Sequence, residues 1–114
     1  MANLNRTTLI GCLGHDPELR YTSGGTAVAT FTLATKDNAW SKSSGELEDK
    51  IEWHNIVLWD KLAEVATEHL TRGKTIYVEG RLQTAKWVNK SGTNRNITEI
   101  VVDRMQMLDK PGEV

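Results

Sequence analysis

The stretch that decides the fold is IEWHNIVLW, residues 51–59, near the middle of the 114-residue chain. Ile56 and Leu58 fall on one side of an extended chain, whereas Trp53 and Trp59 fall on the other. A period of two residues is typical of a β-strand with one face in the core. Because the aliphatic residues fill the core side, we expect both tryptophans on the outer surface, roughly 20 Å apart along the strand.

A helix is predicted directly after this strand. Asp60 has the residue type of an N-cap, and Gly73 is placed to stop the helix at its far end. The residues that recur at helical spacing between them are Leu62, Val65, Ala66 and His69. On the apolar side of such a helix, His69 is expected to be a core histidine.

Four more strands are predicted, over residues 6–13, 27–35, 75–88 and 96–108, with Gly80 as a bulge or bend. Turn residues separate them at 15–17, 23–25 and 89–92, and a long polar loop is expected from Ser41 to Asp49. The predicted fold class is therefore all-β: a five-stranded OB-fold barrel with one α-helix between strands 3 and 4. We place this domain at residues 3–108, followed by a short flexible end at 109–114.

The four tryptophans are the most informative side chains, since the chain has a single phenylalanine. A flat indole can stack on any nucleobase, which contributes ~1–3 kcal/mol per base in a sequence-tolerant way. Large aromatics are more often core residues, but strand alternation puts Trp53 and Trp59 outside. For Trp40 and Trp87 the pattern leaves core and binding surface equally open.

Charge is segregated along a chain whose formal net charge is only −1. Eight acids and three bases lie between Asp37 and Glu68, whereas six bases and one acid lie between Arg72 and Arg95. A local excess of bases can bind phosphates although the whole chain is near neutral. A solvated face is the alternative explanation for this basic run.

Motifs for catalysis and for metal binding are not found. Cys12 is the only cysteine, which excludes an intrachain disulfide and a cysteine-based metal cage. The triplet Gly73-Lys74-Thr75 ends like a P-loop, but residue 68 is glutamate where that motif begins with glycine, and a strand follows it. The histidines lack the spacing of metal ligands. We expect no enzymatic activity, cofactor or metal, and no apolar run is long enough for a membrane span.

Several collinear stretches resemble the bacterial single-stranded DNA-binding protein family. They are residues 9–21 (LIGCLGHDPELRY), 52–58, 61–66, 77–87, 98–102 and 105–108, and the similarity covers residues 3–108. The resemblance implies a homotetramer of OB domains that binds and protects single-stranded DNA during replication, recombination and repair in the cytoplasm, associated with the nucleoid.

The resemblance also assigns residues to roles. It implies base stacking by Trp40, Trp53, Trp59 and Trp87, where the third position is commonly phenylalanine in relatives. It implies basic contacts along the DNA path from Arg6, Arg20, Lys61, Arg72 and Lys86. His54 resembles a position at the subunit interface, although an inward-facing strand residue fits the alternation equally well.

The family's usual acidic, partner-recruiting tail is not found before Val114, so recruitment of replication and repair proteins is not expected of this chain. Three alternatives to sequence-independent DNA binding make different demands on the sequence. A replication accessory OB protein would act mainly through protein contacts, but all four aromatic platforms are retained. A nuclease on this scaffold would need clustered carboxylates on the binding face. RNA binding stays open, because stacking does not read the 2′-hydroxyl.

Overall fold

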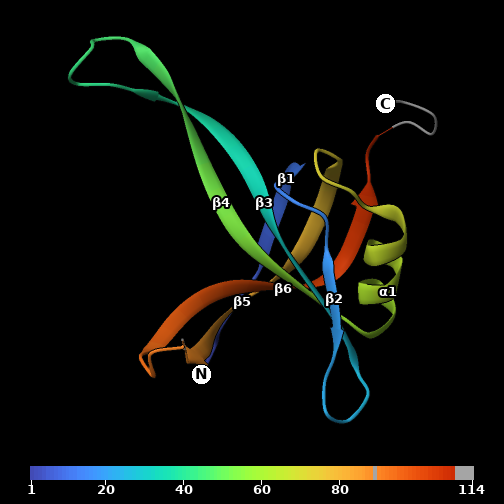
Figure 1. The fold of residues 1–114 in the computed structure, drawn as a ribbon. Helices are drawn as coiled ribbons and strands as arrows, with labels where there is room; N and C mark the ends of the chain where they lie inside the picture. The colour runs from blue at the N-terminus through green and yellow to red at the C-terminus, as the bar shows by residue number, and fades with distance from the viewer. Residues whose placement is uncertain (89, 110–114) are drawn as a thin grey trace.

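The structure, a computed structural model, describes residues 1–88 and 90–109, with the side chain of Trp87 left out. Six strands and one helix follow one another along the chain (Figure 1). Their bounds are β1 (Thr7–Leu13), β2 (Glu18–Tyr21), β3 (Ala27–Trp40), β4 (Leu47–Trp59), α1 (Asp60–His69), β5 (Thr75–Val88) and β6 (Asn94–Met107).

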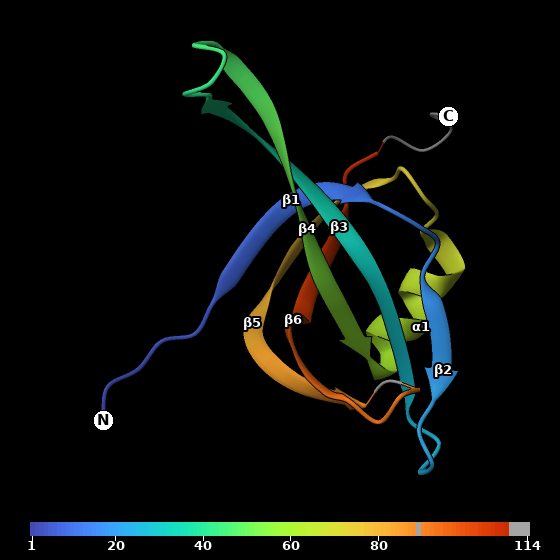
Figure 2. The same ribbon diagram turned by 60° about the vertical axis from the view of Figure 1, so that its left-hand side comes forward.

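Five of the strands close into a barrel in the order β1-β5-β6-β4-β3 (Figure 2). The barrel closes where Cys12 and Leu13 of β1 pair with Ala34 and Leu33 of β3. All neighbours are antiparallel except β4 and β6, which run parallel. The helix follows the third barrel strand in chain order, so the predicted OB fold is confirmed.

The core lies inside this barrel and follows the alternation of the strands. Ile56 and Leu58 of β4 are fully buried, as the sequence predicts, and Leu33 of β3 lies among them. From α1, Ala63 and Ala66 are fully buried in the same cluster. Small side chains let the helix approach closely, and so α1 covers one end of the barrel.

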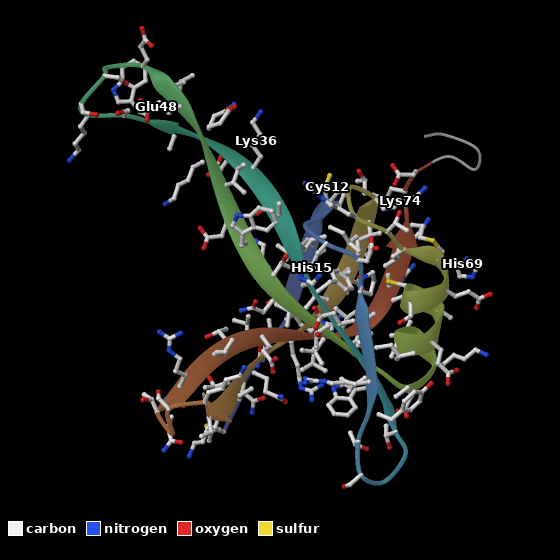
Figure 3. All side chains as sticks on the ribbon, in the orientation of Figure 1. Cys12, His15, Lys36, Glu48, His69 and Lys74 are labelled. Atoms are coloured by element: carbon white, nitrogen blue, oxygen red, sulfur yellow. The ribbon has the colours of Figure 1, made fainter. Side chains whose placement is uncertain are left out.

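Two hairpins extend beyond the barrel as arms (Figure 1). The longer arm is formed by the far half of β3 and the first half of β4, where Trp40 pairs with Leu47. Lys36 and Glu48 lie along this arm (Figure 3). The second arm joins β5 to β6, which pair as far as Val88 and Asn94. Because these segments leave the core, most of their side chains are exposed.

Gly80 is the site of a bulge between β5 and β6, as predicted. Glu79 pairs with Arg104 but Gly80 pairs with Val102, so Asp103 is an extra residue of β6. A Cβ at Gly80 would overlap the carbonyl of Val101. Only glycine allows this close approach of backbones, which bends the sheet into the barrel.

Three local predictions at strand and loop positions need correction. Residues 18–21, between the predicted turns at 15–17 and 23–25, form the additional strand β2 on the edge of β3. The loop between β3 and β4 is shorter than expected, because Glu48 and Asp49 already pair with β3. The cap position belongs to Trp59, without a side-chain hydrogen bond, and Asp60 begins the helix at φ 56°. Aspartate is one of the few residues that tolerates this left-handed conformation.

His69 also differs from its expected role as a core histidine. Its side chain is half exposed, 3.9 Å from the Glu68 carboxylate, and projects from α1 (Figure 3). Near the other end of the chain, Asp109 accepts a 2.8 Å hydrogen bond from the backbone of Thr75. Residues 110–114, which belong to the predicted flexible end, lie outside the described residues. Among the described residues, no helix is long and apolar enough to cross a membrane.

Gly80→Ala is expected to lower the free energy of unfolding by about 1–3 kcal/mol, because the added methyl must displace backbone atoms of β6. Gly24→Ala is the matched control: its φ is not positive and a Cβ there would meet nothing closer than 3.9 Å. The control should change stability by less than about 0.5 kcal/mol. Urea unfolding of both variants measures this difference, and equal stability would contradict the close approach at Gly80.

Candidate nucleic-acid interface

A groove crosses the outer face of β3 and β4. It consists of two adjoining depressions that share Thr30 and Glu99. One wall comes from β2 and the residues before it, and the other comes from β5 and β6. The side chains that define the groove are His15, Glu18, Arg20, Tyr21, Thr30, Thr32, Asn55, Trp59, Gln83, Ile97 and Glu99.

Trp53 lies beside one end of the groove, on the outer face of β4. It pairs with Ala34 of β3, and its indole rests against Gly14, where an added Cβ would lie 2.5 Å from the ring. The side chain is nevertheless 55% exposed. Gly14 thus supports the ring from below and leaves it accessible for stacking, next to His15.

Trp59 lies at the other end of the groove, four residues beyond Asn55 on the same face. It pairs with Val28 of β3, which in turn pairs with Arg20 of β2. Arg20 and Tyr21 line the same depression as Trp59. A guanidinium and two aromatic rings therefore meet in this half of the groove, a combination suited to a base and its phosphate.

Trp40 and Trp87 are the other two predicted platforms, and Trp40 is not part of the groove lining. Trp40 lies at the end of the β3–β4 arm and is 66% exposed, so the core interpretation is wrong for this residue. Trp87 is placed by its backbone in β5, opposite Arg95, and its side chain lies outside the described part of the structure. Three of the four predicted tryptophans thus have exposed rings.

The five predicted basic residues are distributed over different surfaces. Arg20 alone lines the groove. Lys61 is exposed on the first turn of α1, Arg72 in the turn after it, and Lys86 on β5. Arg72 is fixed through its backbone N–H, which donates to the Asp16 carboxylate at 2.8 Å.

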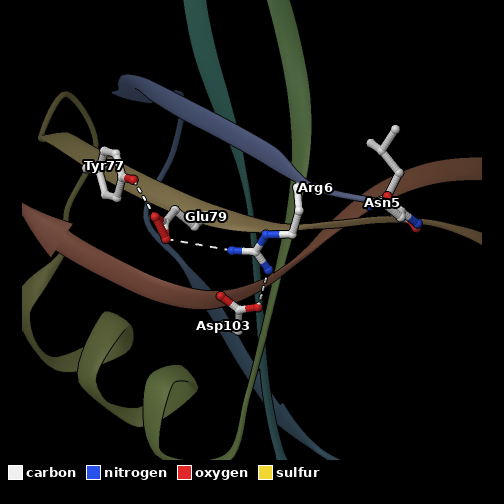
Figure 4. Close-up of polar contacts among 6 residues, drawn as sticks. Asn5, Arg6, Tyr77, Glu79 and Asp103 are labelled. Atoms are coloured by element: carbon white, nitrogen blue, oxygen red, sulfur yellow. Dashed lines mark hydrogen bonds and ion pairs between the residues drawn. The ribbon is translucent and has the colours of Figure 1, made fainter. Parts of the chain in front are cut away.

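Arg6, which directly precedes β1, belongs to a separate ion cluster with residues of β5 and β6 (Figure 4). Its guanidinium donates to Asp103 at 2.7 Å and lies 3.7 Å from Glu79. The hydrogen bond raises the pKa of Arg6 and lowers the pKa of Asp103. Tyr77 donates to Glu79 at 2.6 Å, which raises the pKa of its phenol. The charge of Arg6 is therefore largely balanced within the chain, away from the groove.

His54 points to the opposite side of β4 from Trp53. It is half-buried, and its Nε2 is 2.8 Å from the Thr35 hydroxyl of β3. This hydrogen bond lies at the base of the β3–β4 arm, where the two strands leave the barrel. His54 therefore has a partner within its own chain, and the structure of one chain leaves its interface role a prediction.

Glu99 is the groove residue that sequence reasoning missed. It is only 8% exposed and is the one charged residue among the described side chains that is classed as buried. Desolvation raises the pKa of its carboxyl group, and the charge of Arg20 opposes this shift. Position 99 shares the outer face of β6 with Ile97. Strand alternation could therefore have predicted the direction of the Glu99 side chain, but it could not have predicted that the side chain is buried. Within the described residues, no group of three His, Cys, Asp or Glu side chains could hold a metal ion.

Comparison with known proteins is consistent with this geometry. The chain is similar to a solved structure described as the Plasmodium falciparum SSB complex with ssDNA, at 34% identity and a TM-score of 0.83. The match covers 96% of this chain and 98% of that chain. The model of the single-strand binding protein family matches residues 4–108. The chain therefore belongs to the single-strand binding protein family.

Proposed function

We propose that this chain binds single-stranded DNA independently of sequence and keeps it unpaired during replication, recombination and repair. Bases stack on Trp53, Trp59 and Trp40, and phosphates contact lysine and arginine side chains. The observation that carries this proposal is the pair of exposed tryptophans at the two ends of one groove on β4. The similar Plasmodium protein, whose solved complex contains single-stranded DNA, supports the same ligand.

The groove favours a single strand over a duplex for a physical reason. Stacking needs unpaired bases whose faces are free, whereas a duplex buries those faces between neighbouring base pairs. Rings on a barrel strand are held in fixed positions, so they present flat surfaces without rearrangement. A cytoplasmic, nucleoid-associated site of action is part of the proposal, because that is where a chromosome exposes single strands.

Tryptophan fluorescence should fall strongly when oligo(dT) is added and much less when duplex of equal length is added. Indoles that stack on bases lose fluorescence, and a duplex cannot supply free base faces. The measurement is a titration of the whole chain at several salt concentrations. Equal quenching by duplex would contradict the stacking surface, and no quenching by either ligand would favour an accessory protein that acts through protein contacts.

Two variants separate stacking from charge. Trp53→Ala removes a ring but no cation, so affinity for oligo(dT) should fall by ~1–3 kcal/mol with little change in the salt dependence. Lys86→Ala removes one exposed cation, so the slope of log K against log salt should decrease by about 0.7. Each variant serves as the control for the other. Circular dichroism checks the fold, since loss of structure in Trp53→Ala would mean that the ring has a core role.

Assembly into a homotetramer is a further part of the proposal. Residues 7–11 of β1 pair with β5 on one side only, so their second edge has no strand partner among the described residues. Ile10 on this strand is 58% exposed, next to Tyr77 of β5. An open edge with an exposed aliphatic side chain is a favourable place for a second copy to pair. His54 remains a predicted interface residue on β4.

Light scattering at micromolar concentration should show an oligomer for the native chain and smaller species for Ile10→Asp, because a carboxylate on the β1 face opposes burial. Ile51→Asp is the matched control, since Ile51 is 54% exposed but lies on the β3–β4 arm. It should leave the assembly unchanged. A monomeric native chain would refute the tetramer, and equal behaviour of the two variants would remove β1 as the interface.

A further inference from the structure

Four polar side chains form a row across the floor of the groove, one from each of four neighbouring strands. Thr32 of β3 pairs with Asn55 of β4, Asn55 pairs with Glu99 of β6, and Glu99 pairs with Gln83 of β5. Residues directly opposite each other in a sheet project from the same face. Thr32, Asn55, Glu99 and Gln83, here called the polar row, therefore all face outward between Trp53 and Trp59.

Glu99, in the middle of this row, is a buried acid with unused hydrogen-bonding capacity. The residue is 8% exposed, yet its carboxylate accepts no hydrogen bond from any described residue. No described side-chain oxygen is sealed from solvent without a partner. The Glu99 oxygens must therefore reach solvent through the groove, and both depressions are lined by this residue. A largely buried carboxylate that solvent reaches from the groove can accept hydrogen bonds from a ligand bound there.

The chemistry of the polar row selects the kind of group that fits. A carboxylate repels a phosphate, so the strand must enter the groove with its bases toward the floor. An ionised carboxylate accepts hydrogen bonds from an exocyclic amino group, as on cytosine N4. The amides of Asn55 and Gln83 on either side can donate to ring nitrogens and carbonyl oxygens. Thymine presents a carbonyl oxygen where cytosine presents its amino group. The thymine oxygen and the Glu99 carboxylate are both acceptors, so they cannot form a hydrogen bond with each other.

We propose that Glu99 and its neighbours in the polar row form a base-reading subsite that prefers a base with an exocyclic amino group over thymine. The inference rests on the proposed function and adds a modest preference at one position to otherwise sequence-tolerant stacking. In this arrangement the contacts of Arg20 stay as they are. The charged or titratable groups that line the groove with Glu99 are Arg20, Glu18 and Tyr21 of β2 and His15 before it.

The test compares oligonucleotides of about ten residues, a length that one OB domain can hold, on the native chain and on Glu99→Gln. The ligands are oligo(dC), oligo(dT) and an oligomer of 2-pyrimidinone, which is cytosine without its amino group. For the native chain, the ratio of the oligo(dT) to the oligo(dC) dissociation constant should be about tenfold larger than for Glu99→Gln, because a hydrogen bond to a charged acceptor is lost. Comparing ratios cancels the intrinsic stacking difference between the bases.

The third ligand and a control variant sharpen the result. The 2-pyrimidinone oligomer should bind the native chain and Glu99→Gln alike, because it has no amino group to read. Glu64→Gln on the exposed side of α1 removes the same charge outside the groove lining and should leave the ratio at its native value. A change in the ratio with Glu64→Gln would mean that net charge, rather than the polar row, sets the preference.

Urea unfolding of the native chain and of Glu99→Gln checks that the variant remains folded. Burial raises the pKa of Glu99 above its unfolded value of 4.5, so its ionised form opposes folding at neutral pH and protonation on acidification relieves this effect. Glu99→Gln should therefore be at least as stable as the native chain at pH 7, with the difference narrowing as the pH falls toward 4.5.

The other possible results of the oligonucleotide comparison each lead to a single conclusion. Equal weakening of all three ligands by Glu99→Gln would overturn the inference and show that Glu99 acts by orienting Arg20 or the fold. Unchanged affinities would overturn it as well. If the native chain binds none of the ligands, the proposed function fails first, and this result is distinct from a loss of preference alone.

Discussion

Strand β4 is the constraint on which the rest of the structure depends. It pairs with β3 along its whole length and with β6 over residues 55–57, so its alternation is fixed from both sides. The same register that buries Ile56 and Leu58 in the core puts Trp53 and Trp59 on the outer face. A shift of one residue would exchange these sets and move two indoles into a barrel filled by aliphatic side chains. Burial of the core therefore holds the stacking surface in place.

That coupling explains how much of the structure could be predicted from the sequence. A strand with one buried face has a strong period of two, so the five barrel strands and the outward direction of Trp53 and Trp59 follow from side-chain type. Gly80 could be predicted because only glycine permits backbones to approach so closely. These features depend on the properties of single residues or on short patterns, which a sequence displays directly.

The features that could not be predicted depend on contacts between distant segments. β2 is four residues long and exists because the edge of β3 offers it partners. Glu99 lies in a groove that is also lined by residues of β2 and β5, and alternation in β6 cannot indicate these neighbours. Arg6 illustrates the same limit: its charge is balanced by Asp103 and Glu79, which lie far from it in sequence. A basic residue can be recognised in a sequence, but its partners cannot.

The distribution of charge explains how a nearly neutral chain can still offer a surface for an anionic polymer. In the proposed function, the Glu99 carboxylate on the groove floor favours bases there, whereas the Arg20 guanidinium on the wall favours phosphates nearer to solvent. In the proposed function, stacking contributes most of the affinity within the groove, and the exposed cations Lys61, Arg72 and Lys86 contact the phosphate backbone outside it. Because the floor belongs to paired strands rather than to a loop, its hydrogen-bonding groups keep fixed positions. A rigid floor of this kind is what the proposed base-reading subsite requires, since no rearrangement of the barrel is then needed to discriminate between bases.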